Sequence, residues 1–170
     1  MISLEILAQC VQLLDKSGFA YSQKDVESME LLDFGLGRPL EEGAQILTIV
    51  NTSRMAVKLI VLLPRQVEPE HWHIDSGEVM AKQELLRVIY GRLDVYIEGE
   101  PEEADLPVPA RSLPYYTCRK KVILGPSQQI LIDPPNPHWF KAGDEGCVAL
   151  CVSTTAFDAR DLFRNPGIVR

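Results

Sequence analysis

The chain has 170 residues, about the length of one domain and enough to bury a hydrophobic core without staples. Its composition, 46% hydrophobic and 24% charged with 11 Gly and 12 Pro, excludes a disordered or collagen-like chain. Because 24 acidic side chains face 17 basic ones, the formal net charge is −7, which argues against binding to nucleic acid or to an anionic membrane surface.

The N-terminal segment is predicted to be helical. Apolar residues recur at helical spacing until Ser17-Gly18 interrupts them, namely Ile2, Ile6, Leu7, Val11 and Leu14. Ser22, followed by acidic residues, predicts the N-cap of a second helix that runs to about Leu32. We therefore expect a helical extension over residues 1–35 and one main domain over residues 36–170.

The remainder of the chain has the pattern of short strands separated by Pro, Gly, Asn and Ser. We predict strands at 45–51, 55–63, 70–73, 84–90, 93–99, 115–124, 128–132, 138–141 and 147–153. Gly91-Arg92 is predicted to close a two-residue hairpin, 100–111 to form a solvated acidic loop, and 158–163 to form a short helix. Many strands at short spacing favour an antiparallel sandwich or barrel.

The cysteines predict the cellular compartment. Cys10, Cys118, Cys147 and Cys151 show no C-x-x-C spacing, and the first residues lack the pattern of a secretory signal. We expect reduced thiols in a cytoplasmic protein. The longest apolar run, 59–63, is far shorter than the roughly 20 residues that span a bilayer, so no membrane contact is expected.

The chain contains three histidines, and two of them form a His-x-His pair. Side chains alternate along a strand, so His71 and His73 point to one face and Trp72 to the other. Two imidazoles on one face can chelate a divalent metal ion. The same pattern is also typical of an exposed pair on a polar loop, so the surrounding residues must decide.

The surrounding residues resemble the two motifs of the cupin superfamily. HWH is followed by an acid, then by LLRVIY and Gly91, and a Pro-rich turn, DPPNP, leads into His138. The resemblance implies an all-β cupin barrel, also called a double-stranded β-helix or jelly-roll. The helical pattern of the first 35 residues adds a short N-terminal helical segment to it. It also implies one metal ion bound by His71, His73, a carboxylate of the first motif and His138.

Two carboxylates compete for the fourth ligand position. Glu78 lies at the usual cupin spacing from His73, whereas ten residues separate His73 from Glu84. We favour Glu84, because it begins a predicted strand and keeps the six-residue interval to Gly91.

A closer resemblance, to the short bacterial D-lyxose isomerases, covers nearly the whole chain. It is carried by LLDFGLGR at 31–38, VNTSR at 50–54, PEHWH to AKQE at 69–84, YGRLDVYIEGE at 90–100 and HWFKAGDEG at 138–146. The long insertion after the HWH motif is a feature of that family, which supports Glu84. By analogy with small cupins, we expect a homodimer.

The resemblance implies an aldose–ketose isomerase that interconverts D-lyxose and D-xylulose, and D-mannose and D-fructose, through an enediol. The metal would be one divalent ion per chain, usually Mn²⁺, and the ligand set is also compatible with Fe, Co, Ni or Zn. A small sugar is thus the expected partner.

Strand alternation places further side chains near the metal. Lys58 is in phase with Ile60 on an apolar face, and Lys82 is in phase with Glu84. The resemblance assigns both lysines to sugar contact or acid–base work. Alternation also predicts three more pocket residues, Tyr90, Phe140 and Cys151.

The general base is the weak point of this prediction. The resemblance implies a glutamate on the strand after HWF, but the matching position falls at or near Cys151, and no carboxylate lies between Glu145 and Asp158. The proton transfer then falls to another group, such as Lys82 or a metal-bound hydroxide. Two other functions stay open: an iron-dependent cupin oxygenase and a non-catalytic sugar-binding cupin.

Overall fold

The computed structural model describes residues 2–75, 77, 79–101, 104–154 and 156–170. Its elements in chain order are α1 (Ile2–Ser17), α2 (Gln23–Glu27), β1 (Glu30–Leu32), β2 (Ala44–Asn51), β3 (Ala56–Leu62), β4 (Val67–Trp72), β5 (Glu84–Ile97), the 3-10 turn η1 (Leu113–Tyr115), β6 (Lys120–Leu124), β7 (Gln129–Ile132), β8 (His138–Ser153), the 3-10 turn η2 (Asp158–Arg160) and β9 (Leu162–Phe163).

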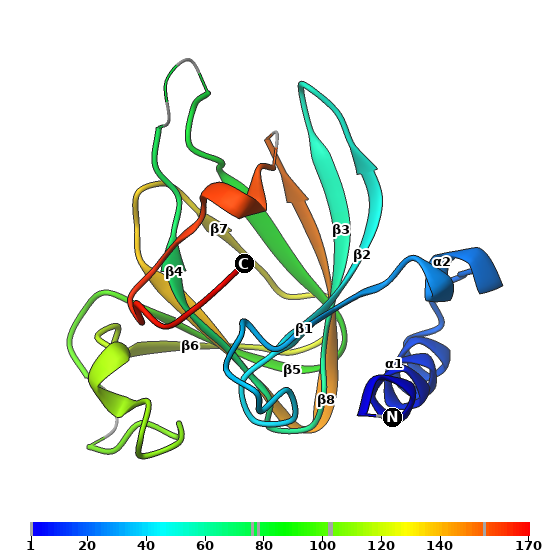
Figure 1. Cartoon of the computed structure of the whole chain (residues 1–170), viewed down its shortest axis with the longest axis horizontal. Helices are drawn as coiled ribbons and strands as arrows, with labels where there is room; N and C mark the ends of the chain where they lie inside the picture. Colours follow the sequence, from blue (N-terminus) through cyan, green and yellow to red (C-terminus); the bar gives the residue numbers. More distant parts are fainter. Residues whose placement is uncertain (1, 76, 78, 102–103, 155) are drawn as a thin grey trace.

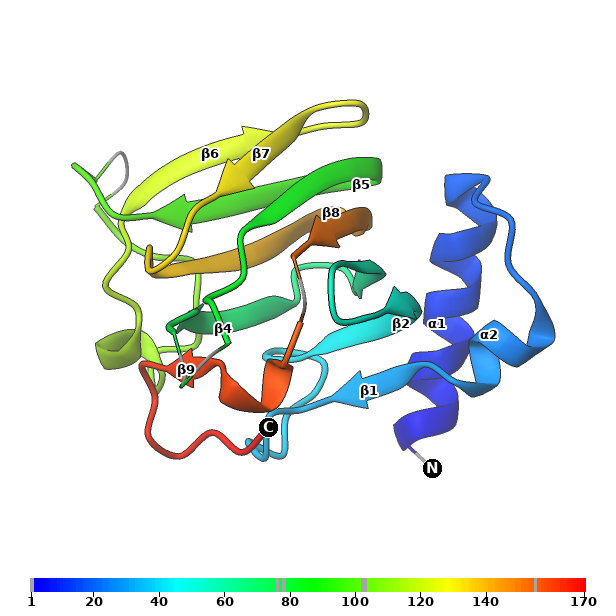
Figure 2. The same ribbon diagram turned by 90° about the horizontal axis from the view of Figure 1, so that it is seen from above.

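The strands form one curled antiparallel sheet (Figure 1). One path runs in the order β1-β2-β3-β8-β4-β9, and β5 pairs with β6, β7 and β8. Seen from above, β5, β6 and β7 lie on one side and β1, β2 and β4 on the other, with β8 between them (Figure 2). The predicted all-β cupin barrel with a helical N-terminal segment is confirmed.

Helix α1 covers part of the outer face of the sheet. Its apolar side buries Ile6, Cys10, Leu13 and Leu14 against residues such as Leu59. Each buried Leu or Ile contributes roughly 1.5–3 kcal/mol relative to exposure, so this contact is sufficient to hold the helix on the barrel. Among the described residues, no helix has the length and apolar character needed to cross a bilayer.

The second helix is shorter than the sequence predicts. Ser22 does cap α2, and its hydroxyl accepts a hydrogen bond from the backbone N–H of Asp25, but the helix ends at Glu27. The next residues form β1, which pairs with β2 through Leu32 and Ala44. The prediction of helix up to about Leu32 is therefore wrong, and we propose that the helical extension ends before Glu30.

The predicted hairpin at Gly91-Arg92 is also wrong, because β5 continues through it and β8 continues through 142–146. The two long strands pair with each other at both ends, and Gly91 lies opposite Cys147. Gly91 has a φ of 75°, and a Cβ there would lie 2.0 Å from the carbonyl oxygen of Gly146. The glycine thus permits a close crossing of two strands, where the sequence predicted a turn.

Two other elements differ in type from the prediction. The segment 115–124 is strand only over β6, since η1 ends at Tyr115 and residues 116–119 lie in no strand. The predicted short helix at 158–163 is η2 followed by β9, which pairs with β4. This pairing brings the C-terminal part of the chain over the inner face of the barrel, beside the histidines.

Candidate metal centre

Four side chains from three strand ends converge inside the barrel. His71 lies in β4 and pairs with His138 at the start of β8, His73 follows β4, and Glu84 begins β5. One ligand atom from each residue lies within 4.8 Å of the others. All four are nearly inaccessible to solvent, with relative exposures of 4% or less. The structure therefore brings together the four residues that the sequence selected.

Each imidazole has its Nδ1 atom bound to an acceptor. Nδ1 of His71 lies 2.8 Å from the carbonyl oxygen of Pro69, and Nδ1 of His138 lies 2.8 Å from that of Asn136. Nδ1 of His73 lies 2.8 Å from Oδ1 of Asp161. Carbonyl oxygens only accept hydrogen bonds, so we assign the proton to Nδ1, which leaves the Nε2 lone pair directed at the centre.

The centre of the cluster requires a positive charge. Nε2 of His138 lies 3.1 Å from Oε1 of Glu84, and Nε2 of His73 lies 3.5 Å from the same oxygen without a hydrogen bond. With the proton on Nδ1, these atoms are acceptors that face a carboxylate at short range. A divalent cation between them removes the repulsion, so the donor set fits a metal ion.

Electrostatics keep His71 and Glu84 in their metal-binding forms, whereas at His73 burial is outweighed by the hydrogen bond to Asp161, which raises the pKa of that imidazole. Burial, followed by the neighbouring His138 and His73, lowers the pKa of His71 to about 3, so its imidazole stays neutral. Burial opposes ionisation of Glu84, but the neighbouring ammonium group of Lys82 favours it, and the pKa of this carboxyl lies well below its usual value. Neutral imidazoles and an ionised carboxylate are the forms that bind metal. The competing Glu78 lies outside the described residues.

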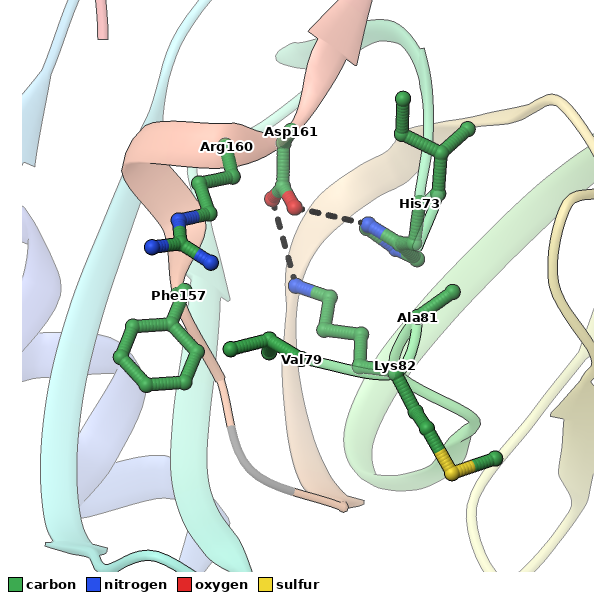
Figure 3. Close-up of a pocket in the computed structure, with 9 residues that line it drawn as sticks. His73, Val79, Ala81, Lys82, Phe157, Arg160 and Asp161 are labelled. Carbon is green, nitrogen blue, oxygen red and sulfur yellow. Dashed lines mark hydrogen bonds and ion pairs between the residues drawn. The ribbon is translucent and has the colours of Figure 1, made fainter. Parts of the chain in front are cut away.

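A charged cavity adjoins the cluster, and its polar lining includes Lys58, Glu68, Lys82, Asp158, Asp161 and Arg170. Nζ of Lys82 lies 3.3 Å from Oδ1 of Asp158, 3.3 Å from Oδ2 of Asp161 and 3.7 Å from Oε2 of Glu84. Lys58 forms an ion pair with Asp158. Figure 3 shows Asp161 between His73 and Lys82, bonded to both.

Comparison with known proteins finds relatives that match nearly the whole chain. The D-lyxose ketol-isomerase of Cohnella laeviribosi is 36% identical over 160 residues, which cover 94% of this chain and 88% of the relative. The D-lyxose/D-mannose isomerase of Thermosediminibacter oceani is 38% identical over 167 residues, which cover 98% and 92%. The chain belongs to the D-lyxose ketol-isomerase family. No family model matches it.

Solved structures support the fold of this D-lyxose ketol-isomerase family member. The L-ribose isomerase of Acinetobacter sp. DL28 in complex with L-ribose superposes with a TM-score of 0.81 at 15% identity, covering 96% of this chain and 91% of that one. The L-ribose isomerase of Cellulomonas parahominis with L-ribose gives 0.80 at 16% identity, with the same coverage. At these identities the likeness establishes the cupin-type barrel alone.

Most of the predicted pocket residues of this family member face the cavity. Lys58, Lys82, Phe140 and Cys151 all line it. The Cys151 Sγ atom lies 3.7 Å from Oε2 of Glu84, and burial followed by that negative charge raises the pKa of the thiol well above its usual value. Cys151 therefore stays protonated and is a poor base.

The prediction that Tyr90 lines the pocket is wrong, since this residue lies outside the cavity. Val88 pairs with Ala149 and Tyr90 with Val148, so β5 contains one extra residue there. Such a bulge reverses the alternation of side chains beyond it. Tyr90 consequently packs with the cluster beneath α1, on the outer face of the sheet.

Sequence reasoning missed four charged cavity residues of this isomerase family member, namely Glu68, Asp158, Asp161 and Arg170. Simple alternation puts Glu68 on the face opposite His71. In the structure Glu68 pairs with Phe140 and His71 with His138, so three residues of β4 span two of β8. This bulge turns Glu68 inward. A proline inside a strand is typical of a bulge, so Pro69 was the available signal.

Proposed function

We infer that this protein is a metal-dependent aldose–ketose isomerase of the D-lyxose isomerase type. One observation carries the inference: a buried set of three imidazoles and one carboxylate, whose lone pairs converge, adjoins a charged cavity. The chain that holds this set is 34–38% identical to proteins named D-lyxose ketol-isomerase or D-lyxose/D-mannose isomerase. We propose D-lyxose and D-xylulose as the main substrate pair, and D-mannose and D-fructose as the second.

The reaction moves one hydrogen between C1 and C2 of the open-chain sugar. His71, His73, Glu84 and His138 would hold the metal ion, for which we propose Mn²⁺. When bound, a divalent ion polarises the sugar carbonyl and stabilises the negative charge of the enediolate. Asp161 orients the ring of His73 through its Nδ1 atom and holds the Nζ atom of Lys82.

The two cavity lysines are suited to binding sugar oxygens. Burial disfavours the charge of Lys82, but the carboxylates of Glu84, Asp161 and Asp158 outweigh it and raise the pKa of the ammonium above its usual value. Lys82 is therefore a charged hydrogen-bond donor rather than a base. Lys58 is paired with Asp158 on the cavity wall. We propose that both lysines donate hydrogen bonds to oxygens of the substrate.

The other functions compatible with the sequence are not favoured. An oxygenase or a non-catalytic binding protein can use the same four ligands, but the relatives that match nearly the whole chain bear isomerase names. We further propose a cytoplasmic homodimer. The four cysteines are buried and unpaired, which supports a reducing compartment, and the homodimer rests on analogy with small cupins.

An assay of the metal-loaded protein tests the function. We expect Mn²⁺-loaded protein to form ketose from D-lyxose, and more slowly from D-mannose, and EDTA-treated protein to form none until Mn²⁺ is restored. The Cohnella laeviribosi relative serves as the positive control. If the relative converts these aldoses and this protein converts none of a pentose and hexose panel, the proposed function is wrong.

A further inference from the structure

Glu68 is a buried carboxylate that the metal site does not use. Its side chain lines the cavity beside His71, Lys82 and Glu84, and the residue is 8% exposed. Its Oε2 atom is inaccessible to solvent and has no hydrogen-bond partner. A buried carboxylate oxygen without a hydrogen-bond partner destabilises the fold, which points to a functional role for Glu68.

The neighbouring glutamate of the same strand is an instructive contrast. Glu70 is also buried, but it accepts hydrogen bonds from the backbone N–H groups of Thr117 (2.6 Å) and Cys118 (2.9 Å) and from Nε of Arg164 (3.0 Å). Its carboxylate ties β4 to the loop before β6. Glu70 is thus satisfied by structural contacts, whereas Oε2 of Glu68 is buried at the cavity without a hydrogen-bond partner.

The position of Glu68 fits a group that acts on a sugar at the metal. Glu68 pairs with Phe140, and His71 pairs with His138 two residues away along β8. At about 3.3 Å per residue, Glu68 lies about 7 Å along the wall from the His71 pair. Glu68 and His71 line the same cavity, so a sugar held at the ligands would lie in a cavity that Glu68 borders.

The other titratable groups of the cavity are already engaged. Lys58 and Lys82 are ion-paired, Asp158 and Asp161 hold those lysines and His73, and Cys151 stays protonated. Glu68 differs from them in carrying an unbonded acceptor atom. Burial, and next the charge of Glu84, raises the pKa of Glu68 to about 7, against the opposing charges of Lys82 and Arg170. A base of this strength is suited to neutral pH.

We propose that Glu68 is the catalytic residue that carries the proton between C2 and C1, a step that rests on the proposed isomerase function. Its Oε2 atom takes the proton from C2 of the aldose, and the C2–H electron pair forms the C1–C2 double bond. The carbonyl electron pair moves to O1, which receives the O2 hydroxyl proton. Oε2 then returns its proton to C1, O2 becomes the ketone oxygen, and no other reactant is consumed.

The test compares Glu68→Gln with the wild-type protein, both loaded with Mn²⁺. We expect kcat for D-lyxose to fall 10²- to 10⁴-fold. We expect the metal content by elemental analysis and the calorimetric Kd for D-lyxose to change less than threefold. Exchange of the C2 proton with D₂O, followed by NMR, should fall in parallel with kcat, an effect that a purely structural role would not produce.

Two further variants complete the experiment. Glu68→Asp keeps the carboxylate but shortens its reach, so it should retain more activity than Glu68→Gln at the same metal content. Glu70→Gln is the matched control, a buried glutamate two residues away, whose folded fraction should keep C2 exchange within a few-fold of wild type. The proposal is overturned if Glu68→Gln has the kcat of wild type. It is also overturned if the loss of activity is explained by a lower metal content or a weaker affinity for D-lyxose. An inactive wild type would instead refute the isomerase function.

Discussion

Glu68 and His71 point into the same cavity although they lie three positions apart on β4, a spacing that puts side chains on opposite faces of a regular strand. Their partners on β8, Phe140 and His138, lie two residues apart, and the difference is absorbed by one extra residue on β4. The bulge therefore combines, on one strand, a metal-ligand candidate and a buried carboxylate whose Oε2 atom has no hydrogen-bond partner.

Removing one imidazole tests the metal centre. His138 is fully buried, and its Nε2 atom lies 3.1 Å from Glu84. In His138→Ala we expect the bound metal to fall below about a tenth of the wild-type content, because only three of the four ligands remain to bind it. Elemental analysis after dialysis measures this, with circular dichroism as the check on folding. Stoichiometric metal in folded His138→Ala would exclude this ligand set.

The orienting role of Asp161 predicts a smaller effect. Without its carboxylate, the Nδ1 proton of His73 has no fixed acceptor, and the ring loses its orientation. We expect Asp161→Ala to lower metal affinity about 10- to 100-fold, the usual cost of losing such a partner. Competition with a fluorescent chelator measures the affinity. Asp144→Ala is the control, since that exposed side chain pairs with Arg65 away from the site. Equal affinities in the two variants would contradict the role.

Glu68 also predicts the pH dependence of stability in the metal-free protein. Its pKa is raised in the fold from the ordinary 4.5 to about 7, by burial first and by Glu84 next. Between these pH values the folded state binds more protons than the unfolded state, so the free energy of unfolding falls as pH rises. Glu68→Gln should remove a penalty on the order of 1–3 kcal/mol at pH 8 and almost none near pH 4.5.

Urea denaturation of EDTA-treated protein at pH 5, 6.5 and 8 measures this effect, because a bound cation would alter the charge near Glu68. Glu145→Gln, at an exposed position on β8, is the control and should follow the wild-type curve. A Glu68→Gln variant that is less stable than wild type at pH 8 would show that the carboxylate is held by favourable contacts.

The crossing of β5 and β8 predicts a strong dependence on Gly91. A Cβ at this position would lie 2.0 Å from the carbonyl oxygen of Gly146, and the φ of 75° is itself unfavourable for alanine. We expect Gly91→Ala to destabilise the protein by about 3 kcal/mol or more. Gly37→Ala is the control, since Gly37 has a φ of 70° but no heavy atom within 4 Å of its Cβ position. Its cost should be about 1 kcal/mol. Similar thermal midpoints for both variants would contradict the close crossing.

Much of the site follows from local pattern. The face shared by His71 and His73 and the inward direction of Lys58 follow from strand alternation, and the choice of Glu84 follows from its place at the start of a strand and its interval to Gly91. The D-lyxose isomerase resemblance supplied the family, and the curated relatives confirmed it.

What the sequence did not predict has two physical origins. Bulges reversed the faces of Glu68 and Tyr90, and a single extra residue leaves almost no trace in an alternating pattern. Asp158 and Asp161 reach the site because β9 pairs with β4, about 90 residues away in the chain, and such long-range pairing is not encoded in local periodicity. The hairpin predicted at Gly91 was wrong because glycine is needed where two strands approach closely as well as in tight turns.

Pro69 links the direction of the Glu68 side chain to the orientation of the His71 ring. Its place in the bulge turns Glu68 into the cavity, and its carbonyl oxygen fixes the Nδ1 atom of His71. A substitution that straightens β4 would therefore rotate the carboxylate away and release the imidazole together. The backbone path of this stretch of barrel wall thus sets the direction of a carboxylate and the orientation of an imidazole at the same time.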